Sequence, residues 1–266
     1  MMRRPLRTVS AFVAATLLLG CGHTPTGRHQ LQFFPADQVA KMGQTAFVQM
    51  KQQTPIAQGD ATSRYVACVA QSITAVVPKP QGGGKWDITV FKDDQVNAFA
   101  LPGGGIGVYT GLLKAARTPD QLAAVIGHEI GHVQASHANA RLSTQYATEA
   151  GLSLIQSLAG KNPEESRNIM AFLGMGAQVG ILLPFSRADE SEADLLGVQY
   201  MAQAGYDPRE AIALWQNMQQ IGGARPPTWL STHPSSEQRI ANLRAQLPQA
   251  LKLYQPSRKP GCAPVR

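Results

Sequence analysis

Residues 128–132 read His-Glu-Ile-Gly-His, and this run constrains the chain more than any other feature of its 266 residues. On an α-helix, His128 and His132 lie four positions apart on one face, so both imidazoles can reach a single metal ion. Glu129 lies next to His128 but off the face that the two histidines share. From there its carboxylate can take a proton from a metal-activated water without being a ligand. The spacing therefore predicts a helix-borne Zn²⁺ site of the kind found in hydrolases.

The surrounding sequence favours a buried helix over a chance match on an unrelated helix surface. Thr118 is a suitable N-cap, Pro119 suits the first helical position, and Asp120 places an acid in the first turn. Apolar residues line the remainder of the segment: Leu122, Val125, Ile126, Ile130 and Val133. Imidazole and carboxylate groups among such neighbours are costly to bury without a partner, and a metal ion is such a partner.

The next histidine along the chain tests which kind of zinc site this is. His137 follows His132 by five residues, with no glycine between them. The pattern HExxHxxGxxH needs that glycine and a histidine six residues on, so the chain departs from it. We expect His137 to lie at the helix end near the last carbonyls, and the third ligand to come from elsewhere.

An acidic segment at residues 185–194 is the best source of a third ligand. On a helix, Glu190 and Asp194 share a face, whereas Glu192 points away from it. Gly197 is small enough to let this helix approach the histidine helix closely. We expect Glu190 to bind the metal and Asp194 to lie behind a ligating histidine, where a carboxylate fixes the ring's tautomer. The alternative is a solvated acidic helix start.

His-Glu-Ile-Gly-His followed by Ser-Arg-Ala-Asp-Glu-Ser-Glu-Ala-Asp resembles the gluzincin metallopeptidase family that includes the CAAX prenyl endopeptidases and HtpX. The resemblance covers most of residues 90 to 245, because further segments match as well. These are residues 97–104, 106–112, 232–234 and 239–240. The resemblance implies one Zn²⁺ per chain with Glu190 as third ligand. It also implies an α+β fold, a mainly helical zincin-type metalloprotease domain with a small β-sheet beside the active-site cleft.

The resemblance assigns roles to two further segments. It implies that Asn97, Ala98 and Phe99 lie on an edge strand, where an extended substrate pairs by main-chain hydrogen bonds. The alternative for Phe99 is simple core packing. His233, in a Thr-His-Pro context, is the expected catalytic donor to the oxyanion. It could also bind the open zinc position and keep the enzyme latent.

The amino terminus has the pattern of a bacterial lipoprotein signal. Three arginines precede a short apolar run at residues 9–19, which is too brief to span a bilayer. Leu-Leu-Gly-Cys at residues 18–21 reads as a lipobox, which predicts cleavage before Cys21 and its lipidation. An ordinary secretory signal is the alternative. Because Gly22 is not an aspartate, we expect attachment to the outer membrane, as in the soluble periplasmic lipoprotein (LoiP-like) branch of the family.

These features predict the organisation of the chain. The expected segments are a lipoprotein signal peptide at 1–20, a linker at 21–35, a zinc metallopeptidase domain at 36–250 and a C-terminal tail at 251–266. The signal carries three arginines and no acid, so its removal lowers the formal charge from +7 to +4. Such a small, scattered charge argues against nucleic acid as a partner.

Two cysteines remain after lipidation of Cys21. An even pair in an exported protein favours a disulfide between Cys68 and Cys262 over two free thiols. This bond would tie the tail to an early helix and close a long loop.

Hydrophobic periodicity predicts the secondary structure. Helical spacing covers residues 37–77 with a break at 54–55, and alternating or apolar runs predict three strands at 86–91, 96–100 and 106–109. The glycine run at 103–107 lacks the spacing of a phosphate loop and predicts a tight turn. Residues 168–184 are uncharged and apolar, and would form either a cover over the cleft or a core helix.

The expected function is that of a zinc endopeptidase on the periplasmic face of the outer membrane. Its substrates would be unfolded, misassembled or damaged exported and outer-membrane proteins, with assembly partners possible. Two other functions stay open: a chaperone-like outer-membrane-protein assembly lipoprotein with latent or structural zinc, and a zinc hydrolase of another bond, such as a cell-wall amidase. The amidase is less favoured because no sugar-binding aromatic cluster is evident.

Overall fold

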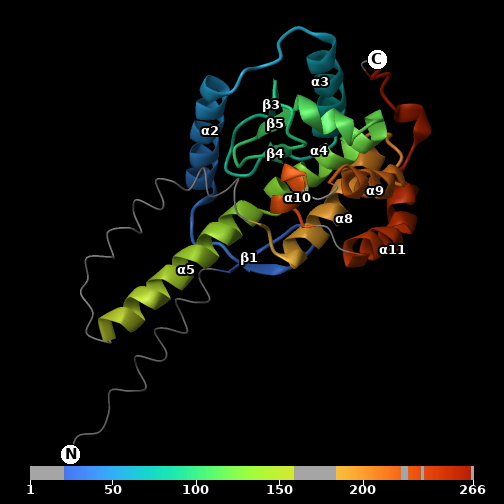
Figure 1. Ribbon diagram of the computed structural model, residues 1–266. Helices are drawn as coiled ribbons and strands as arrows, with labels where there is room; N and C mark the ends of the chain where they lie inside the picture. Colours follow the sequence, from blue (N-terminus) through green and yellow to red (C-terminus); the bar gives the residue numbers. More distant parts are fainter. Residues whose placement is uncertain (1–20, 159–183, 223–226, 235–236, 265–266) are drawn as a thin grey trace, which may run out of the picture.

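The computed structural model describes residues 21–158, 184–222, 227–234 and 237–264. The predicted signal peptide lies outside the described residues, as does the apolar segment 168–184 apart from its last residue. Figure 1 shows helix α4 in the middle of the molecule, with a small sheet on one side and helices α8, α9 and α11 on the other. This arrangement is the expected α+β fold, mainly helical with a small sheet.

The sheet has three strands in the order β3-β5-β4: β3 Asp87–Phe91, β4 Ala98–Ala100 and β5 Gly105–Tyr109. β3 runs parallel to β5, and β4 runs antiparallel to it. Each strand overlaps a predicted one, so all three predictions are confirmed. β4 lies at an edge of the sheet and packs against α4.

The turn between β4 and β5 depends on glycine. Gly103 and Gly104 have φ angles of 85° and 99°, in the left-handed region that side chains disfavour. Leu101 N donates to Gly105 O at 2.8 Å and closes the turn. The predicted tight turn is therefore confirmed, and it brings β4 back alongside β5.

The central helix α4 spans Pro119–Gln134 and begins as predicted, because Thr118 Oγ1 accepts a hydrogen bond from Gln121 N. It ends where Ser136 adopts a φ of 55°. The next helix, α5, starts at once and spans His137–Leu158, extending away from the body of the molecule. His137 therefore lies at a helix end, as expected, but at the start of α5, and its ring bonds to His132 and Glu192.

Helix α8, Arg187–Gln203, packs closely against α4. It begins with a capping box in which Ser186 and Asp189 exchange side-chain and main-chain hydrogen bonds. A Cβ atom on Gly197 would lie only 2.8 Å from His128 N, so the two backbones touch where a larger residue would separate them. This close approach brings the acidic face of α8 to the histidines of α4.

The other helices complete the core around α4. They are α2 Ala36–Gln53, α3 Ala61–Thr74, α9 Glu210–Gly222, α10 Thr228–Thr232 and α11 Glu237–Leu253, with short 3₁₀ turns η1 Thr110–Lys114 and η3 Pro256–Arg258. The break between α2 and α3 includes the predicted Thr54-Pro55 position. Within the described ranges, no helix is both long enough and apolar enough to cross a bilayer.

The segment predicted to be a linker is not a free connection. It contains an antiparallel hairpin of β1 Cys21–His23 and β2 His29–Leu31. Gln30 Nε2 donates to Ala135 O at 2.6 Å, and Phe33 N donates to Ser143 Oγ at 2.8 Å. The hairpin therefore packs on the ends of α4 and α5, which local polarity alone does not predict.

The C-terminal tail is attached to the domain by the predicted disulfide. Cys68 of α3 and Cys262 are bonded, with their Cα atoms 5.7 Å apart. Lys259 Nζ also lies 2.6 Å from Asp120 Oδ2 at the start of α4. The disulfide prediction is confirmed, and the tail packs against α3 and α4.

Candidate metal centre

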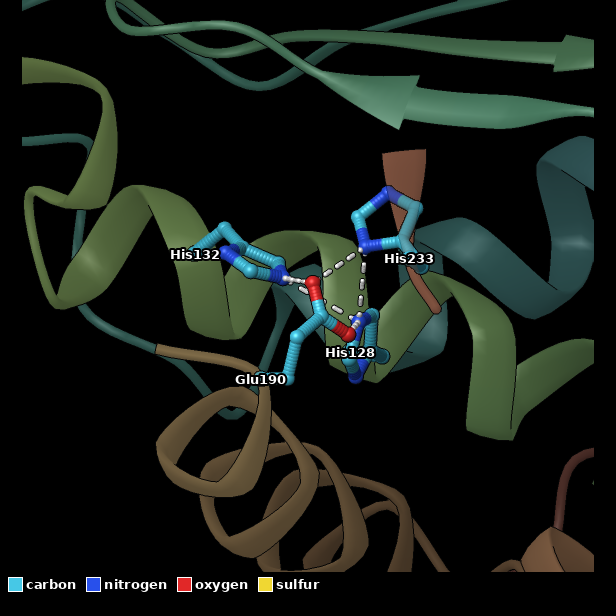
Figure 2. A group of neighbouring side chains, drawn as sticks. All are labelled: His128, His132, Glu190 and His233. Carbon is cyan, nitrogen blue, oxygen red and sulfur yellow. Dashed lines mark hydrogen bonds and ion pairs between the residues drawn. The ribbon is translucent and has the colours of Figure 1, made fainter. Parts of the chain in front are cut away.

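Four side chains from three segments converge on one point (Figure 2). His128 and His132 come from α4, Glu190 comes from the start of α8, and His233 follows α10. One donor atom from each lies within 4.8 Å of all the others, and all four residues are buried. The sequence placed the first three together as metal ligands and His233 across the cleft from them.

The distances between donor atoms match a single small ion. His128 Nε2 lies 3.1 Å from His132 Nε2 and 3.2 Å from His233 Nδ1. Glu190 Oε1 lies 2.9 Å from His233 Nδ1 and 3.5 Å from His132 Nε2. Tetrahedral Zn²⁺ with bonds near 2.0–2.1 Å separates its ligand atoms by roughly 3.3 Å.

The far side of the His128 ring shows why these nitrogens need a cation. His128 Nδ1 lies 3.0 Å from Asp194 Oδ1, so the ring's proton belongs on Nδ1. The Nε2 lone pair then faces the nitrogens of His132 and His233 at short range. Several lone pairs and a carboxylate directed at one point repel each other unless a proton or a metal ion lies between them, and four such donors at these distances fit Zn²⁺.

Asp194 is itself fixed by a bidentate pair. Arg239 Nε donates to Asp194 Oδ2 at 2.8 Å, and Nη2 donates to Oδ1 at 2.7 Å. The guanidinium also stacks on the Trp215 ring at 4.1 Å, and its Nη1 lies 2.5 Å from Glu190 Oε2. One arginine thus connects the carboxylate behind His128 with the carboxylate that faces the metal position.

Burial and charge shift the pKa values of these groups in the metal-free protein. Burial disfavours the His128 imidazolium, but hydrogen bonds to Asp194 and Glu190 outweigh it and raise the pKa of His128 to about 9. Burial disfavours the carboxylate of Glu190, but His233 and hydrogen bonds from His128 and His132 hold its pKa far below the ordinary value. This lowered pKa favours the deprotonated form of Glu190, which is the form that binds a metal ion.

Glu129 lies beside the metal group without belonging to it. Its Oε1 accepts a 2.7 Å hydrogen bond from Trp229 Nε1 and lies 3.4 Å from His233 Nε2. The carboxylate is buried, with 3% of the residue exposed, and Trp229 is 1% exposed. Glu129 thus has the place of a general base, next to the metal position and turned toward the cleft.

A hollow adjoins this site along strand β4. Residues 97–101, Glu129, Phe185, Thr232 and His233 line it. The Phe185 ring also stacks on His132 with centroids 3.9 Å apart, which covers one face of that ligand. The hollow therefore runs from the edge strand to the predicted base and donor.

The main chain of β4 has groups that face this hollow. Two hydrogen bonds to β5 flank the strand, from Tyr109 N to Asn97 O and from Leu101 N to Gly105 O. Because bonded and non-bonded pairs alternate in an antiparallel ladder, the N–H and C=O groups of Ala98 and Ala100 face away from β5. An extended peptide could pair with them.

Phe99 does not offer its side chain to that peptide. Its ring packs with Phe47, Phe91 and Tyr109 in an aromatic cluster between α2 and the sheet. The structure places the Phe99 ring in the core, as the alternative interpretation expected, whereas the prediction itself concerned main-chain pairing of the strand with substrate. Main-chain pairing through Ala98 is compatible with the structure, and the role of this strand stays a prediction.

The spacing along the chain did not predict which residues contact the ligands and Glu129 from behind. Trp229 was not singled out, Arg239 stood only within a matching segment, and His137 was considered only as a ligand. Trp229 lies four residues before His233, and that spacing within a short helical turn was the one available signal. The contacts of Arg239 with Asp194 and of His137 with Glu192 are made across helices, where sequence spacing carries no information.

Fold and site together define a zinc metallopeptidase of the HExxH type. The chain belongs to peptidase family M48, whose pattern matches residues 60–247. It is 38% identical over 191 residues to the mitochondrial metalloendopeptidase OMA1 of Schizosaccharomyces pombe, across 71% of this chain and 54% of that protein. It is also 32% identical over 245 residues to OMA1 of Danio rerio, across 86% of this chain and 50% of that protein.

A bacterial relative is similar over a shorter region. The chain is 30% identical over 162 residues to the β-barrel assembly-enhancing protease of Escherichia coli K12, across 58% of this chain and 33% of that protein. The chain thus spans about half, or less, of the length of these curated relatives. Neither name is that of a LoiP-like lipoprotein, so the predicted lipoprotein branch stays a prediction.

Proposed function

We propose that this chain is a zinc-dependent endopeptidase that cleaves unfolded or misassembled proteins of the bacterial cell envelope. The observation that carries the proposal is the buried convergence of His128, His132 and Glu190 beside Glu129. Membership of family M48 supports the peptidase activity. The open main-chain groups of β4 support an extended polypeptide as substrate.

In this proposal His128, His132 and Glu190 hold the ion, and Glu129 moves the proton. When bound, Zn²⁺ supplies Lewis acidity, which polarises a carbonyl and lowers the pKa of water. Glu129 takes a proton from the attacking water and later delivers it to the nitrogen of the leaving amine. The hydrogen bond from Trp229 orients the carboxylate for both transfers.

His233 has two roles in the proposal. Its Nδ1 lies among the prospective ligand atoms, so the ring can fill the position that water needs and keep the enzyme latent. Its Nε2 lies 3.4 Å from Glu129 Oε1. Once Nδ1 leaves the metal position, the imidazole can donate a hydrogen bond to the oxyanion of the tetrahedral intermediate.

The cellular setting is proposed from the amino terminus and one group of relatives. The lipobox ending at Cys21 supports a lipid anchor on the periplasmic face of the outer membrane. The name of the E. coli and Yersinia pestis relatives, β-barrel assembly-enhancing protease, supports outer-membrane proteins as substrates and assembly factors as partners. Incorporation of labelled palmitate in cells, abolished in Cys21→Ser, tests the anchor.

One observation favours a second candidate function. With His233 included, four protein donors surround the metal position, and structural zinc sites close all four positions in this way. A chaperone-like assembly lipoprotein with latent or structural zinc would have this arrangement. It would bind unfolded outer-membrane proteins along β4 without cleaving them.

The deciding experiment is cleavage of an unfolded model protein by the purified chain. We expect fragments from the wild type, and none from Glu129→Gln or from protein stripped with a chelator and not reloaded. Glu237→Gln, on the exposed start of α11, is the matched control and should cleave normally. The chaperone function would instead be established if the folded, zinc-loaded wild type cleaved nothing and suppressed aggregation of the model protein as well as Glu129→Gln does.

A further inference from the structure

His132 is the one α4 histidine in the metal group without a carboxylate directly behind it among the described residues. Its Nδ1 lies 2.9 Å from His137 Nδ1 at the start of α5. His137 is fully buried, and its Nε2 lies 3.2 Å from Glu192 Oε2. A buried row of three side chains therefore runs from the metal position to a carboxylate on α8.

Each neutral imidazole donates from one nitrogen and accepts at the other, so the hydrogen bonds of this row all donate in one direction, from His132 toward Glu192. His132 Nε2 faces the metal position, so the proton of the neutral ring lies on Nδ1 and is donated to His137 Nδ1. His137 must then carry its own proton on Nε2, where Glu192 accepts it. Glu192 thus selects the tautomer of His137, and His137 selects that of His132.

The carboxylate at the end of the row is fixed by the N-terminal hairpin. Thr26 Oγ1 donates a short hydrogen bond to Glu192 Oε1, and Arg28 Nε donates to Oε2 at 2.8 Å. Arg28 Nη2 also pairs with Asp189 in the first turn of α8. Glu192 is 6% exposed, so the hairpin supplies the partners that compensate its burial.

We propose that His137 and Glu192 are positioning residues for the zinc ligand His132, and that the hairpin residues Thr26 and Arg28 complete the arrangement. The inference rests on the proposed assignment of His132 as a ligand. It goes further in making zinc affinity depend on a segment more than a hundred residues earlier in the chain. His128 needs no such help because Asp194 lies directly behind it and is itself held by Arg239.

The consequence is measurable because outer hydrogen bonds to metal ligands contribute about ten- to a hundredfold in metal affinity. In the purified chain, Glu192→Gln removes the charge that orients His137 and should weaken Zn²⁺ binding by about that factor in competition with a chromophoric chelator. His137→Phe removes both hydrogen bonds but keeps an aromatic ring at this position, and should weaken Zn²⁺ binding likewise. His137→Asn keeps a hydrogen-bond acceptor for His132, so its Zn²⁺ affinity should lie between those of His137→Phe and the wild type.

The absorption spectrum of the Co²⁺-loaded protein separates ligand orientation from a general loss of stability. We expect the visible bands to shift in Glu192→Gln and His137→Phe, and to stay unchanged in Glu237→Gln. Arg28→Gln lies on the surface side of the row and leaves the buried rings in place. It should lower zinc affinity even if a buried variant fails to fold, and wild-type affinity in Arg28→Gln and Glu192→Gln would overturn the inference.

His132→Ala distinguishes this inference from the assignment on which it rests. If His132→Ala binds Zn²⁺ as tightly as the wild type, the proposed metal site itself is wrong, and the inference with it. If His132→Ala loses the metal while His137→Phe and Glu192→Gln keep wild-type affinity and Co²⁺ spectra, only the positioning role is overturned.

Discussion

Trp229 Nε1 donates a 2.7 Å hydrogen bond to Glu129 Oε1, although the two residues are 100 positions apart in the sequence. Both are buried, and the indole also lies beside the rings of His128 and His233. The main chain of Trp229 is also bonded to the segment before β4, because its N–H donates to Val96 O at 3.1 Å. The base of the proposed reaction is therefore oriented by a residue that also contacts the segment leading into β4.

Trp229→Phe should lower turnover without affecting zinc binding. The substitution keeps an aromatic ring but removes the donor, and a hydrogen bond to a charged group contributes about 1.5–3 kcal/mol. We expect kcat to fall by about ten- to a hundredfold while KM and chelator resistance stay close to wild type. Steady-state kinetics on a quenched peptide would check this, and an unchanged kcat would show that Glu129 is oriented without the indole.

His233→Ala should weaken the metal site as well as change turnover. His233 Nδ1 lies 3.2 Å from His128 Nε2, so its loss removes one of four donors around the ion. We expect Zn²⁺ to dissociate at least about tenfold faster, equivalent to about 1.4 kcal/mol. Transfer of the metal to a colorimetric chelator measures the rate. If neither this rate nor turnover changes, His233 has only a structural role.

Gly197→Ala should separate α4 from α8. The new Cβ atom would lie 2.8 Å from His128 N, where backbone cannot move aside cheaply. Overpacking of this kind costs about 1–3 kcal/mol in the free energy of unfolding, and it should also move Glu190 away from the histidines. Chemical denaturation and zinc titration would detect both effects. Gly261→Ala is the matched control, because a Cβ atom there meets nothing within 4 Å.

Removing the disulfide should lower stability more than activity. Cys68 and Cys262 are 194 residues apart in the sequence, and the bond lies on the α3 side of the molecule, outside the metal group. We expect Cys68→Ser to lose about 2–4 kcal/mol of unfolding free energy, the usual range for a native disulfide. Thermal unfolding with and without a reductant would show this. If the reductant lowers the melting temperature of Cys68→Ser as much as that of the wild type, its effect does not come from this bond.

Asp207 should contribute stability only above the pKa of an unfolded aspartate. Its hydrogen bonds with Arg209 are the main reason that its pKa is lowered from the ordinary value. A lowered folded-state pKa stabilises the protein fully above about pH 3.9, and this contribution is lost as the pH falls through the folded-state value. Asp207→Asn should therefore be less stable at pH 7, by under about 1 kcal/mol because the pair is exposed. Urea unfolding at pH 7 and pH 3 should show the difference shrinking with acid.

The sequence by itself determined the elements in which spacing along the chain is the physical signal. The N-cap Thr118 and the four-residue spacing of His128 and His132 define α4 and put both rings on one face. The same helical geometry brought Glu190 and Asp194 onto one side of α8, where the structure places them against the histidines. Alternation of apolar residues located the three strands, and cysteine number indicated the disulfide.

Only the tertiary structure decided which side chains stand behind these groups. Trp229 beside Glu129, Arg239 beside Asp194 and Glu192 beside His137 are contacts between different helices. The hairpin at residues 21–31 is polar and short, so no local pattern distinguishes it from a linker until Arg28 meets the acids of α8. Helical periodicity fixes which face a residue shares, whereas the partner across that face depends on how the helices pack, and packing is a property of the whole chain.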